Sequence, residues 1–206
     1  MKRLYLLRHG QTEFNVKKLV QGRCDSPLTD LGRQQAQAAA EWLKARGVVP
    51  DKVVSSPLGR AMDTASLVAC EILGPDATVE PCEGIIERGY GTFEEGPHDA
   101  LPTDVWDPGE DLVPFGGEGS RALQERMVDT LTNLMGAEGI ETLLAVSHGS
   151  ASRQFIKAAA PKGFELPAKL PNCAIMIFDF DDAREEDDTP QCKFTLQQIV
   201  DPQQSH

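Results

Sequence analysis

Two short apolar runs, each ending in a histidine followed by a glycine, constrain the fold of this chain most. The first occupies residues 4–7 and continues into Arg8 and His9; the second occupies residues 143–146 and continues through a serine into His148. Such continuous apolar runs are typical of strands buried on both faces of a parallel sheet. Arginine and histidine do not fit inside these strands, so we expect them at the carboxyl edge, where open α/β sheets bind ligands. Either histidine alone is most simply explained as a hydrogen-bonded side chain at the start of a loop. Two of the chain's only four histidines in this position favour a functional site.

Composition restricts the class of partner. The 206 residues include 32 acidic and 20 basic side chains, a net charge of −12, which argues against nucleic acid or an anionic membrane as the main partner. No apolar run is long enough to span a bilayer, and the first residues lack the pattern of a signal peptide. The five cysteines are an odd number without metal-ligand spacing. We therefore expect a cytoplasmic protein with free thiols.

The first helix is predicted from residue 30 to about residue 46. Thr29 fits the N-cap position, and Gly47 fits the position just after the helix end. Apolar residues recur at helical spacing and are expected to face the core; they are Leu31, Ala39, Trp42 and Leu43.

A second strand is predicted at residues 52–55, with a helix directly after it. Pro57 suits the first turn of that helix, which also contains Arg60. An arginine beside a helix N-terminus at a strand end is a candidate phosphate ligand, although most such arginines are solvated surface charges. Residues 78–82 are a weaker strand, expected at an edge because it contains a proline.

The second half of the sequence predicts the remaining helices and strands. Residues 92–119 are rich in proline, glycine and acidic residues and are expected to form a lid-like excursion. A helix is predicted at 120–135, a strand at 143–147, a helix at 150–160, and two closing strands at 174–180 and 194–199 around an acidic hairpin tip at 181–188. This alternation predicts a single domain, a three-layer α/β/α sandwich on a mostly parallel sheet.

The polar residues expected at the strand ends suit phosphoryl transfer. Arg8, His9, Arg60 and His148 make an anion pocket rather than a metal site, because no carboxylates cluster with them. Guanidinium groups match phosphate oxygens, and a neutral imidazole can accept a phosphoryl group. Glu87, on a glycine-rich bend, can protonate a departing alkoxide. We expect neither a metal nor a cofactor.

Several short sequence motifs also occur along residues 3–180, in an order that a known family shares. They are Arg8-His9-Gly10 with Glu13 and Asn15; Gly22 with Asp25-Ser26-Pro27-Leu28-Thr29; Ser55-Ser56-Pro57-Leu58 with Arg60 and Thr64; Glu87-Arg88-Gly89-Tyr90-Gly91; Gly117-Glu118; Ser147-His148-Gly149 with Arg153; and Asn172. Together they resemble the histidine phosphatase superfamily, also called the phosphoglycerate mutase-like family.

The resemblance implies a role for each matching residue. His9 resembles the nucleophile that becomes phosphohistidine, and Glu87 the acid for the leaving oxygen and then the base for water. Arg8, Arg60 and His148 are similar to the catalytic phosphate clamp, which stabilises charge on the transferring group. The other implied substrate and phosphate contacts are Asn15, Gln21, Gly22, Tyr90 and Gly149. The chain departs from the family pattern at two positions: Glu95 separates Glu94 from Gly96, and Gly119 separates Glu118 from Ser120. Both positions fall in or beside the excursion, so they bear on substrate choice more than on chemistry.

Three functions compete at this stage: a phosphomonoesterase for a small-molecule phosphate ester, a cofactor-dependent phosphoglycerate mutase, and a catalytically weak phosphate-binding module. The module would show gaps in the constellation, and there are none. A nucleotide-binding sheet protein would need a glycine-rich loop after the first strand, which is missing. The natural substrate and the oligomeric state stay open.

The residues after the acid block favour the phosphatase. No lysine or arginine occurs between Arg88 and Arg121, whereas the mutases of the family carry a basic segment there. Eight acidic residues lie in this interval: Glu94, Glu95, Asp99, Asp104, Asp107, Glu110, Asp111 and Glu118. If they face the pocket, they select a neutral or cationic organic phosphate; if they face solvent, they select nothing.

Overall fold

In the computed structural model, six strands form one sheet within the described residues, 1–182 and 192–204. Their order is β3-β2-β4-β1-β5-β6, with parallel pairing from β3 to β1 and antiparallel pairing from β1 to β6. The strands are β1 (Lys2–Arg8), β2 (Lys52–Ser55), β3 (Glu80–Pro81), β4 (Thr142–Ser147), β5 (Ile175–Phe180) and β6 (Phe194–Val200). The predicted mostly parallel sheet is confirmed.

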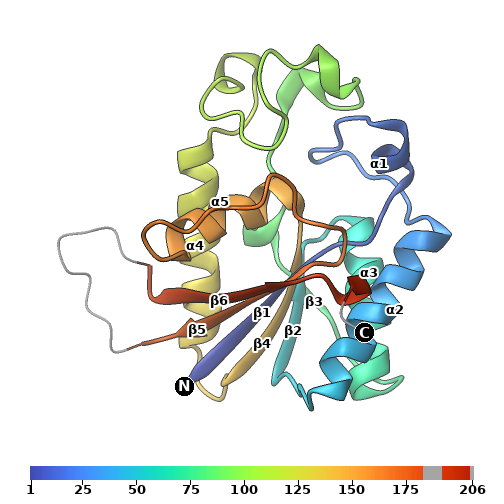
Figure 1. The fold of residues 1–206 in the computed structure, drawn as a ribbon, viewed down its shortest axis with the longest axis vertical. Coiled ribbons are helices and arrows are strands. Elements are labelled where there is room, and N and C mark those ends of the chain that lie inside the picture. Colours follow the sequence, from blue (N-terminus) through green and yellow to red (C-terminus); the bar gives the residue numbers. More distant parts are fainter. Residues whose placement is uncertain (183–191, 205–206) are drawn as a thin grey trace.

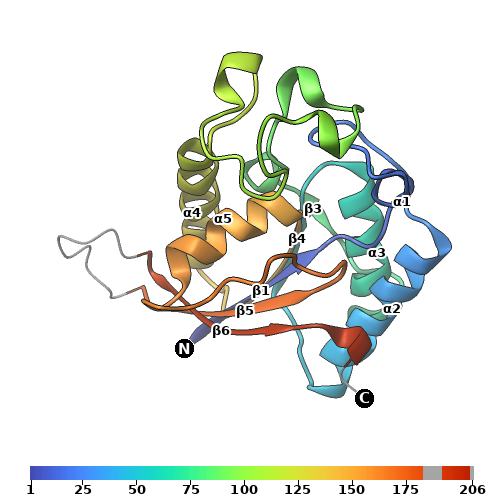
Figure 2. The same cartoon turned by 45° about the horizontal axis from the view of Figure 1, so that its top comes forward.

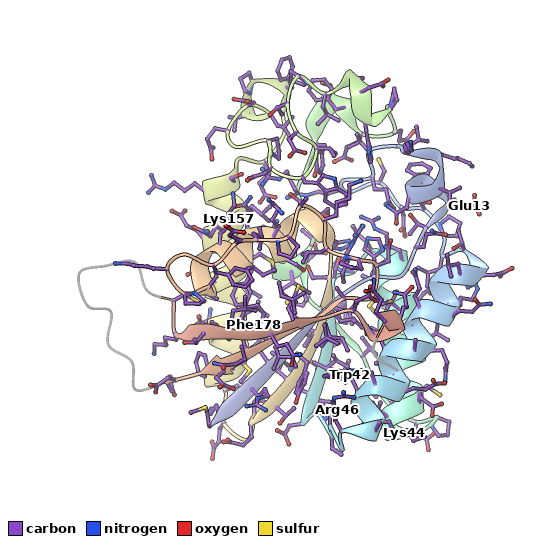
Figure 3. All side chains as sticks on the ribbon, viewed as in Figure 1. Glu13, Trp42, Lys44, Arg46, Lys157 and Phe178 are labelled. Carbon is purple, nitrogen blue, oxygen red and sulfur yellow. The ribbon has the colours of Figure 1, made fainter. Side chains whose placement is uncertain are left out.

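Helices cover both faces of the sheet (Figure 1). Two of them, α2 (Asp30–Ala45) and α3 (Gly59–Leu73), pack on one face around a core that includes Trp42. On the other face, α4 (Ser120–Gly136) and α5 (Gly149–Ala159) enclose a core that includes Phe178. Figure 3 labels both side chains, on opposite sides of the sheet. The predicted three-layer sandwich is confirmed.

Strand register brings the two histidine motifs together. β1 lies between β4 and β5, and Arg8 pairs with Ser147 across the parallel β1–β4 ladder. The His9 amide donates to the Ser147 carbonyl at 3.0 Å, so both histidines leave the sheet at one edge. β2 joins the same edge through β4, which places the start of α3 beside them.

Helix α2 begins where the N-cap pattern predicts, but its buried face differs by one position. The Gly32 amide donates to Thr29 Oγ1 at 3.0 Å, and Gly47 adopts a φ of +65° just after the helix. Leu31, expected in the core, is 46% exposed. The buried stripe instead begins at Gly32, because this residue packs against the loop that follows β1.

Two further boundaries correct the sequence prediction. Pro57 precedes α3 rather than lying in its first turn, since Leu58 is the N-cap and the helix begins at Gly59; Arg60 remains in the first turn. β3 lies at the sheet edge as predicted but has only two residues. The short helix α1 (Glu13–Lys17) was not predicted, because its five residues bury no side chain and show no apolar period.

The segment 92–119 is folded rather than irregular. It contains or overlaps three short 3-10 turns: η2 (Gly91–Phe93), η3 (His98–Ala100) and η4 (Val113–Phe115). The segment lies above the carboxyl edge of the sheet, in green and yellow-green at the top of Figure 2. Asp107 ties it to α5 by accepting from Gln154 at 3.0 Å and pairing with Lys157.

Two further sequence predictions concern the acidic hairpin tip and the absence of a membrane span. The predicted acidic hairpin tip, residues 181–188, falls outside the described residues from 183 onward. Within the described part of the chain, no helix is both long enough and apolar enough to cross a bilayer.

Candidate active site

A pocket of about 480 Å³ opens at the carboxyl edge of the sheet. Nearly all the residues predicted for the site line it: Arg8, His9, Asn15, Gln21, Gly22, Arg60, Glu87, Tyr90 and Gly149. His148, the remaining predicted residue, is fully buried beside His9, with ring centroids 5.1 Å apart. The structure therefore brings together side chains that are up to 140 positions apart in the chain.

His9 presents a defined tautomer. Its Nδ1 lies 2.7 Å from the Gly10 carbonyl oxygen, and because a carbonyl only accepts, Nδ1 carries the proton. The lone pair is then on Nε2. Burial, reinforced by the positive charges of Arg60 and Arg8, holds the pKa of His9 well below its usual value. The imidazole is therefore neutral, and nucleophilic at Nε2, at neutral pH.

His148 is held by a residue that sequence reasoning did not select for the site. Its Nε2 lies 2.7 Å from Ser56 Oγ, within the Ser-Ser-Pro turn that leads to α3. Burial first, and then the Arg60 charge, hold the pKa of His148 well below the ordinary histidine value. The Ser-Ser-Pro run was visible in the sequence, but the contact depends on the β2–β4 pairing.

Arg8 and Arg60 are almost fully buried cations beside the two imidazoles. Arg8 donates to the Leu170 carbonyl, and Arg60 donates to the Cys24 and Gly22 carbonyls at 2.7 Å each. Burial lowers the pKa of Arg8 to about 10, which leaves it charged at neutral pH.

Three buried nitrogens of this group have no hydrogen-bond partner in the described residues: Nε of Arg8, Nε of Arg60 and Nδ1 of His148. Buried polar atoms are nearly always partnered in folded proteins. Phosphate oxygens are acceptors that suit guanidinium donors in a bidentate geometry. The group is therefore suited to a phosphate dianion.

The Glu87 carboxyl group lies at the N-terminus of α5. Oε1 accepts from the amides of Arg88 at 2.8 Å and Ala151 at 2.9 Å, and Oε2 accepts from the Ser150 amide at 3.2 Å. The free amides at a helix N-terminus supply hydrogen-bond donors for both oxygens of this carboxyl group. These bonds place Glu87 at the wall of the pocket with 8% exposure.

The loop around α1 supplies the uncharged contacts. Thr12 closes a capping box with Asn15 and also donates to Gln21 Oε1 at 2.9 Å. Asn172 donates to Asn15 Oδ1 at 3.2 Å, which joins this loop to the segment that precedes β5. Gly22 has a φ of +54°, and a Cβ there would lie 2.2 Å from Glu94 Oε1, so a side chain would be strained and would displace the Glu94 carboxylate.

Tyr90 and Trp106 cover one side of the pocket. The Tyr90 hydroxyl donates to the Val105 carbonyl at 2.7 Å, and the Trp106 ring centroid lies 5.2 Å from Arg8 Cζ. A Cβ at Gly149 would lie 2.9 Å from the Trp106 ring. Sequence reasoning missed Trp106, although a tryptophan in a polar excursion, one of two in the chain, was an available signal.

The acidic side chains of segment 92–119 do not line the pocket. Glu94 accepts from the Arg23 and Tyr90 amides, Glu110 accepts from the Arg121 amide, and Glu118 pairs with Arg126. Of the two possibilities left open for this segment, the one in which its negative charge faces the substrate is not found, because none of its carboxylates lines the pocket. Across residues 1–182 and 192–204, no three histidine, cysteine, aspartate or glutamate side chains cluster closely enough for a metal ion.

The fold and the pocket define a class: an α/β sandwich with a buried, cationic, histidine-bearing pocket at the carboxyl edge of its sheet. Comparison with known families makes this specific. The model of the histidine phosphatase superfamily (branch 1) matches residues 4–189, nearly the whole chain. The chain belongs to this superfamily, so the predicted family and the predicted phosphatase type of enzyme are confirmed.

Similar proteins carry two kinds of name. A probable phosphoglycerate mutase, GpmB of Proteus mirabilis, is 32% identical over 87% of this chain and 86% of its own length. The broad-specificity phosphatase YOR283W of Saccharomyces cerevisiae is 34% identical over 75% of this chain and 69% of its own. Among solved structures, a phosphoserine phosphatase mutant of Entamoeba histolytica in complex with phosphoserine is 28% identical, with a TM-score of 0.75 and 98% coverage of both chains.

Proposed function

We propose that this protein is a metal-independent phosphomonoesterase that hydrolyses a small organic phosphate through a phosphohistidine at His9. The observation that carries the proposal is the His9 tautomer, a neutral ring whose Nδ1 is bound to the Gly10 carbonyl and whose Nε2 is left to attack. The buried guanidinium groups of Arg8 and Arg60 lie near enough for their charges to act on His9, and they supply charge for the transferring phosphoryl group.

In the first half-reaction, His9 Nε2 forms a bond to phosphorus as the ester P–O bond breaks. The Glu87 carboxyl gives its proton to the departing oxygen, which leaves as an alcohol. In the second half-reaction, a water oxygen attacks phosphorus, its proton passes to Glu87, and the N–P bond breaks. Inorganic phosphate leaves, and both side chains return to their starting protonation, so no other reactant is required.

A phosphatase whose name declares broad specificity and a structural neighbour that binds phosphoserine support hydrolysis. The phosphoglycerate mutase remains the second candidate, because several relatives carry that name. The two activities share the phosphoenzyme and differ in whether water or a second substrate oxygen takes the phosphoryl group. A purified protein that interconverts 2- and 3-phosphoglycerate faster than it releases phosphate is a mutase.

The nucleophile is tested with His9→Ala, which should abolish turnover, since no other residue of the pocket can hold the phosphoryl group. The wild type should give an acid-labile, base-stable phosphoenzyme and keep its activity in EDTA. His98→Asn is the matched control, because it removes the other histidine that lines the pocket and should leave the phosphoenzyme intact. Near-normal turnover by His9→Ala, or loss of wild-type activity in EDTA, would contradict the mechanism.

A further inference from the structure

The pocket holds two lysines that the chemistry above does not use. Lys18 and Lys169 both contribute to its lining, along with His98. None of these three was selected from the sequence as a site residue. Both side chains are exposed at the mouth, whereas Arg8 and Arg60 are buried. The positive charge of the pocket therefore extends beyond the group that suits the phosphate.

Neither lysine is neutralised by the protein. In the part of the chain that the structure describes, only three basic side chains form neither an ion pair nor a hydrogen bond: Lys18, Lys162 and Lys169. Two of the three line the pocket. With a net charge of −12, acidic partners are abundant elsewhere on the chain, so an unpaired pair at this mouth is notable.

The backbones of both lysines lie beside residues that line the pocket. Lys18 ends α1 with a φ of 54°, and its carbonyl accepts from the His98 amide at 3.1 Å. Lys169 precedes Leu170, whose carbonyl accepts from Arg8. The charges of both lysines act on His98 and contribute to lowering its pKa, after burial, which places them around the same part of the mouth.

A cationic pair of this kind favours an anion on the far end of a bound substrate. Lysine is a flexible point charge that binds carboxylate or phosphate oxygens without a fixed geometry. An opposite charge held a few ångströms away adds a Coulomb attraction, which solvent and salt screen at an exposed site. The phosphate that reacts is already matched by Arg8, Arg60 and the imidazoles, so the lysines are free for a second group.

We propose that Lys18 and Lys169 form a subsite for a second anionic group, so that the preferred substrate is an organic phosphate that also carries a carboxylate or another phosphate. This proposal rests on the phosphatase activity proposed above. It differs from the preference for a neutral or cationic phosphate that was one possibility for segment 92–119, because those carboxylates do not line the pocket and these lysines come from other segments.

The test compares substrates that differ only at the far end: butyl phosphate, 4-phosphonooxybutanoate and butane-1,4-diol bisphosphate. We expect wild-type kcat/KM for the two anionic substrates to exceed that for butyl phosphate by about tenfold or more. Comparison of the carboxylate with the bisphosphate identifies which anion the subsite takes. The preference should weaken as ionic strength rises, because the lysines are solvent-exposed.

Lys18→Met and Lys169→Met should each reduce the preference ratio by about three- to tenfold, mainly through KM. Lys162→Met is the matched control: an equally unpaired lysine outside the pocket, it should leave the ratio as in the wild type. A fall with either pocket lysine supports the subsite and identifies the contacting residue. A wild-type ratio near one, or an equal fall with Lys162→Met, would overturn it.

Failure of the underlying activity gives a different result. If the protein is not a phosphatase, the wild type releases no phosphate from any of the three esters or from p-nitrophenyl phosphate, and no ratio can be measured. If it is a phosphatase without this subsite, all three esters are hydrolysed at similar kcat/KM.

Discussion

At the scale of single residues, the pocket depends on keeping two imidazoles neutral between two cations. His9 and His148 are buried with ring centroids 5.1 Å apart, and the charges of Arg8 and Arg60 oppose protonation of both. The same guanidinium charges attract a phosphate dianion. In the proposed mechanism, one arrangement of charge therefore serves both the attacking imidazole and the binding of the group that it attacks.

Glu87→Gln should separate proton delivery from phosphate binding. The amide cannot protonate a leaving alkoxide, so kcat for alkyl phosphates should fall by about 10²–10⁴-fold. Phosphorylation by p-nitrophenyl phosphate should fall much less, because its leaving group is a stable anion. Single-turnover formation of the phosphoenzyme with both substrates measures this difference. Equal losses on the two substrates would assign the acid to another residue.

The same substitution also has a structural cost that needs its own control. A glutamine NH₂ in place of Oε2 would face the Ser150 amide, leaving a donor unsatisfied at about 1–3 kcal/mol of stability. Glu94→Gln is a companion variant outside the pocket lining: Glu94 Oε1 accepts both the Arg23 and the Tyr90 amides, and a glutamine oxygen can keep these two bonds. It should lose less stability than Glu87→Gln and should not acquire dependence on the leaving group.

At the scale of elements, α2 and the loop after β1 approach each other backbone to backbone. A Cβ at Gly32 would lie 2.1 Å from the Gln11 carbonyl oxygen, and a Cβ at Gly10 would lie 2.4 Å from the Gly32 carbonyl oxygen. This contact holds the two residues that follow the nucleophile. The N-cap at Thr29 fixes the start of α2 so that Gly32 meets the loop.

Gly32→Ala should therefore destabilise the protein despite alanine's better helix propensity. We expect the free energy of unfolding to fall by about 1–3 kcal/mol, because the contacted atoms are backbone and cannot rotate away. kcat/KM should fall as well, since the loop carrying His9 must shift. Urea unfolding and steady-state kinetics measure the two effects.

Gly136→Ala is the control for helix propensity, because this residue ends α4 and nothing lies within 4 Å of its added Cβ. Its stability should be unchanged or raised by up to about 1 kcal/mol. A stable, fully active Gly32→Ala protein would show that α2 can move without displacing the nucleophile.

At the scale of the whole molecule, stability should depend on pH through the buried histidines. The pKa values of His9 and His148 are lowered in the folded state, so below about pH 6.5 the unfolded chain binds protons that the folded chain does not. This contribution is complete above that pH and is lost as pH falls. Each histidine should contribute a slope of up to about 1.4 kcal/mol per pH unit.

Urea unfolding between pH 7.5 and 5 measures this slope. The lowered pKa values of Asp51 and Asp107 act with the same sign but only near the acidic range of carboxylates, below this window. His98, whose pKa burial also lowers, adds to the slope, so the comparison is with His9→Asn and His148→Asn. Each variant should have a shallower slope than the wild type; unchanged slopes would mean that these rings titrate normally in the folded protein.

Local pattern was enough to predict the layers and the place of His9 at the sheet edge. The apolar run before Arg8 is buried on both faces, and Thr29 and Gly47 bound α2, because burial period and capping are short-range properties of the chain. The histidine at each strand end could be placed on the sheet edge for the same reason: a charged or polar side chain is excluded from the interior of such a strand.

What a side chain faces was decided by tertiary contacts. Leu31 sits on a helical stripe by spacing but is exposed, because Gly32 is the residue that meets the neighbouring loop. The carboxylates of segment 92–119 are directed to nearby amides and cations, whereas Lys18 and Lys169 converge on the pocket from distant segments. The orientation of a charge depends on long-range packing and on competing partners, and residue order alone does not specify these.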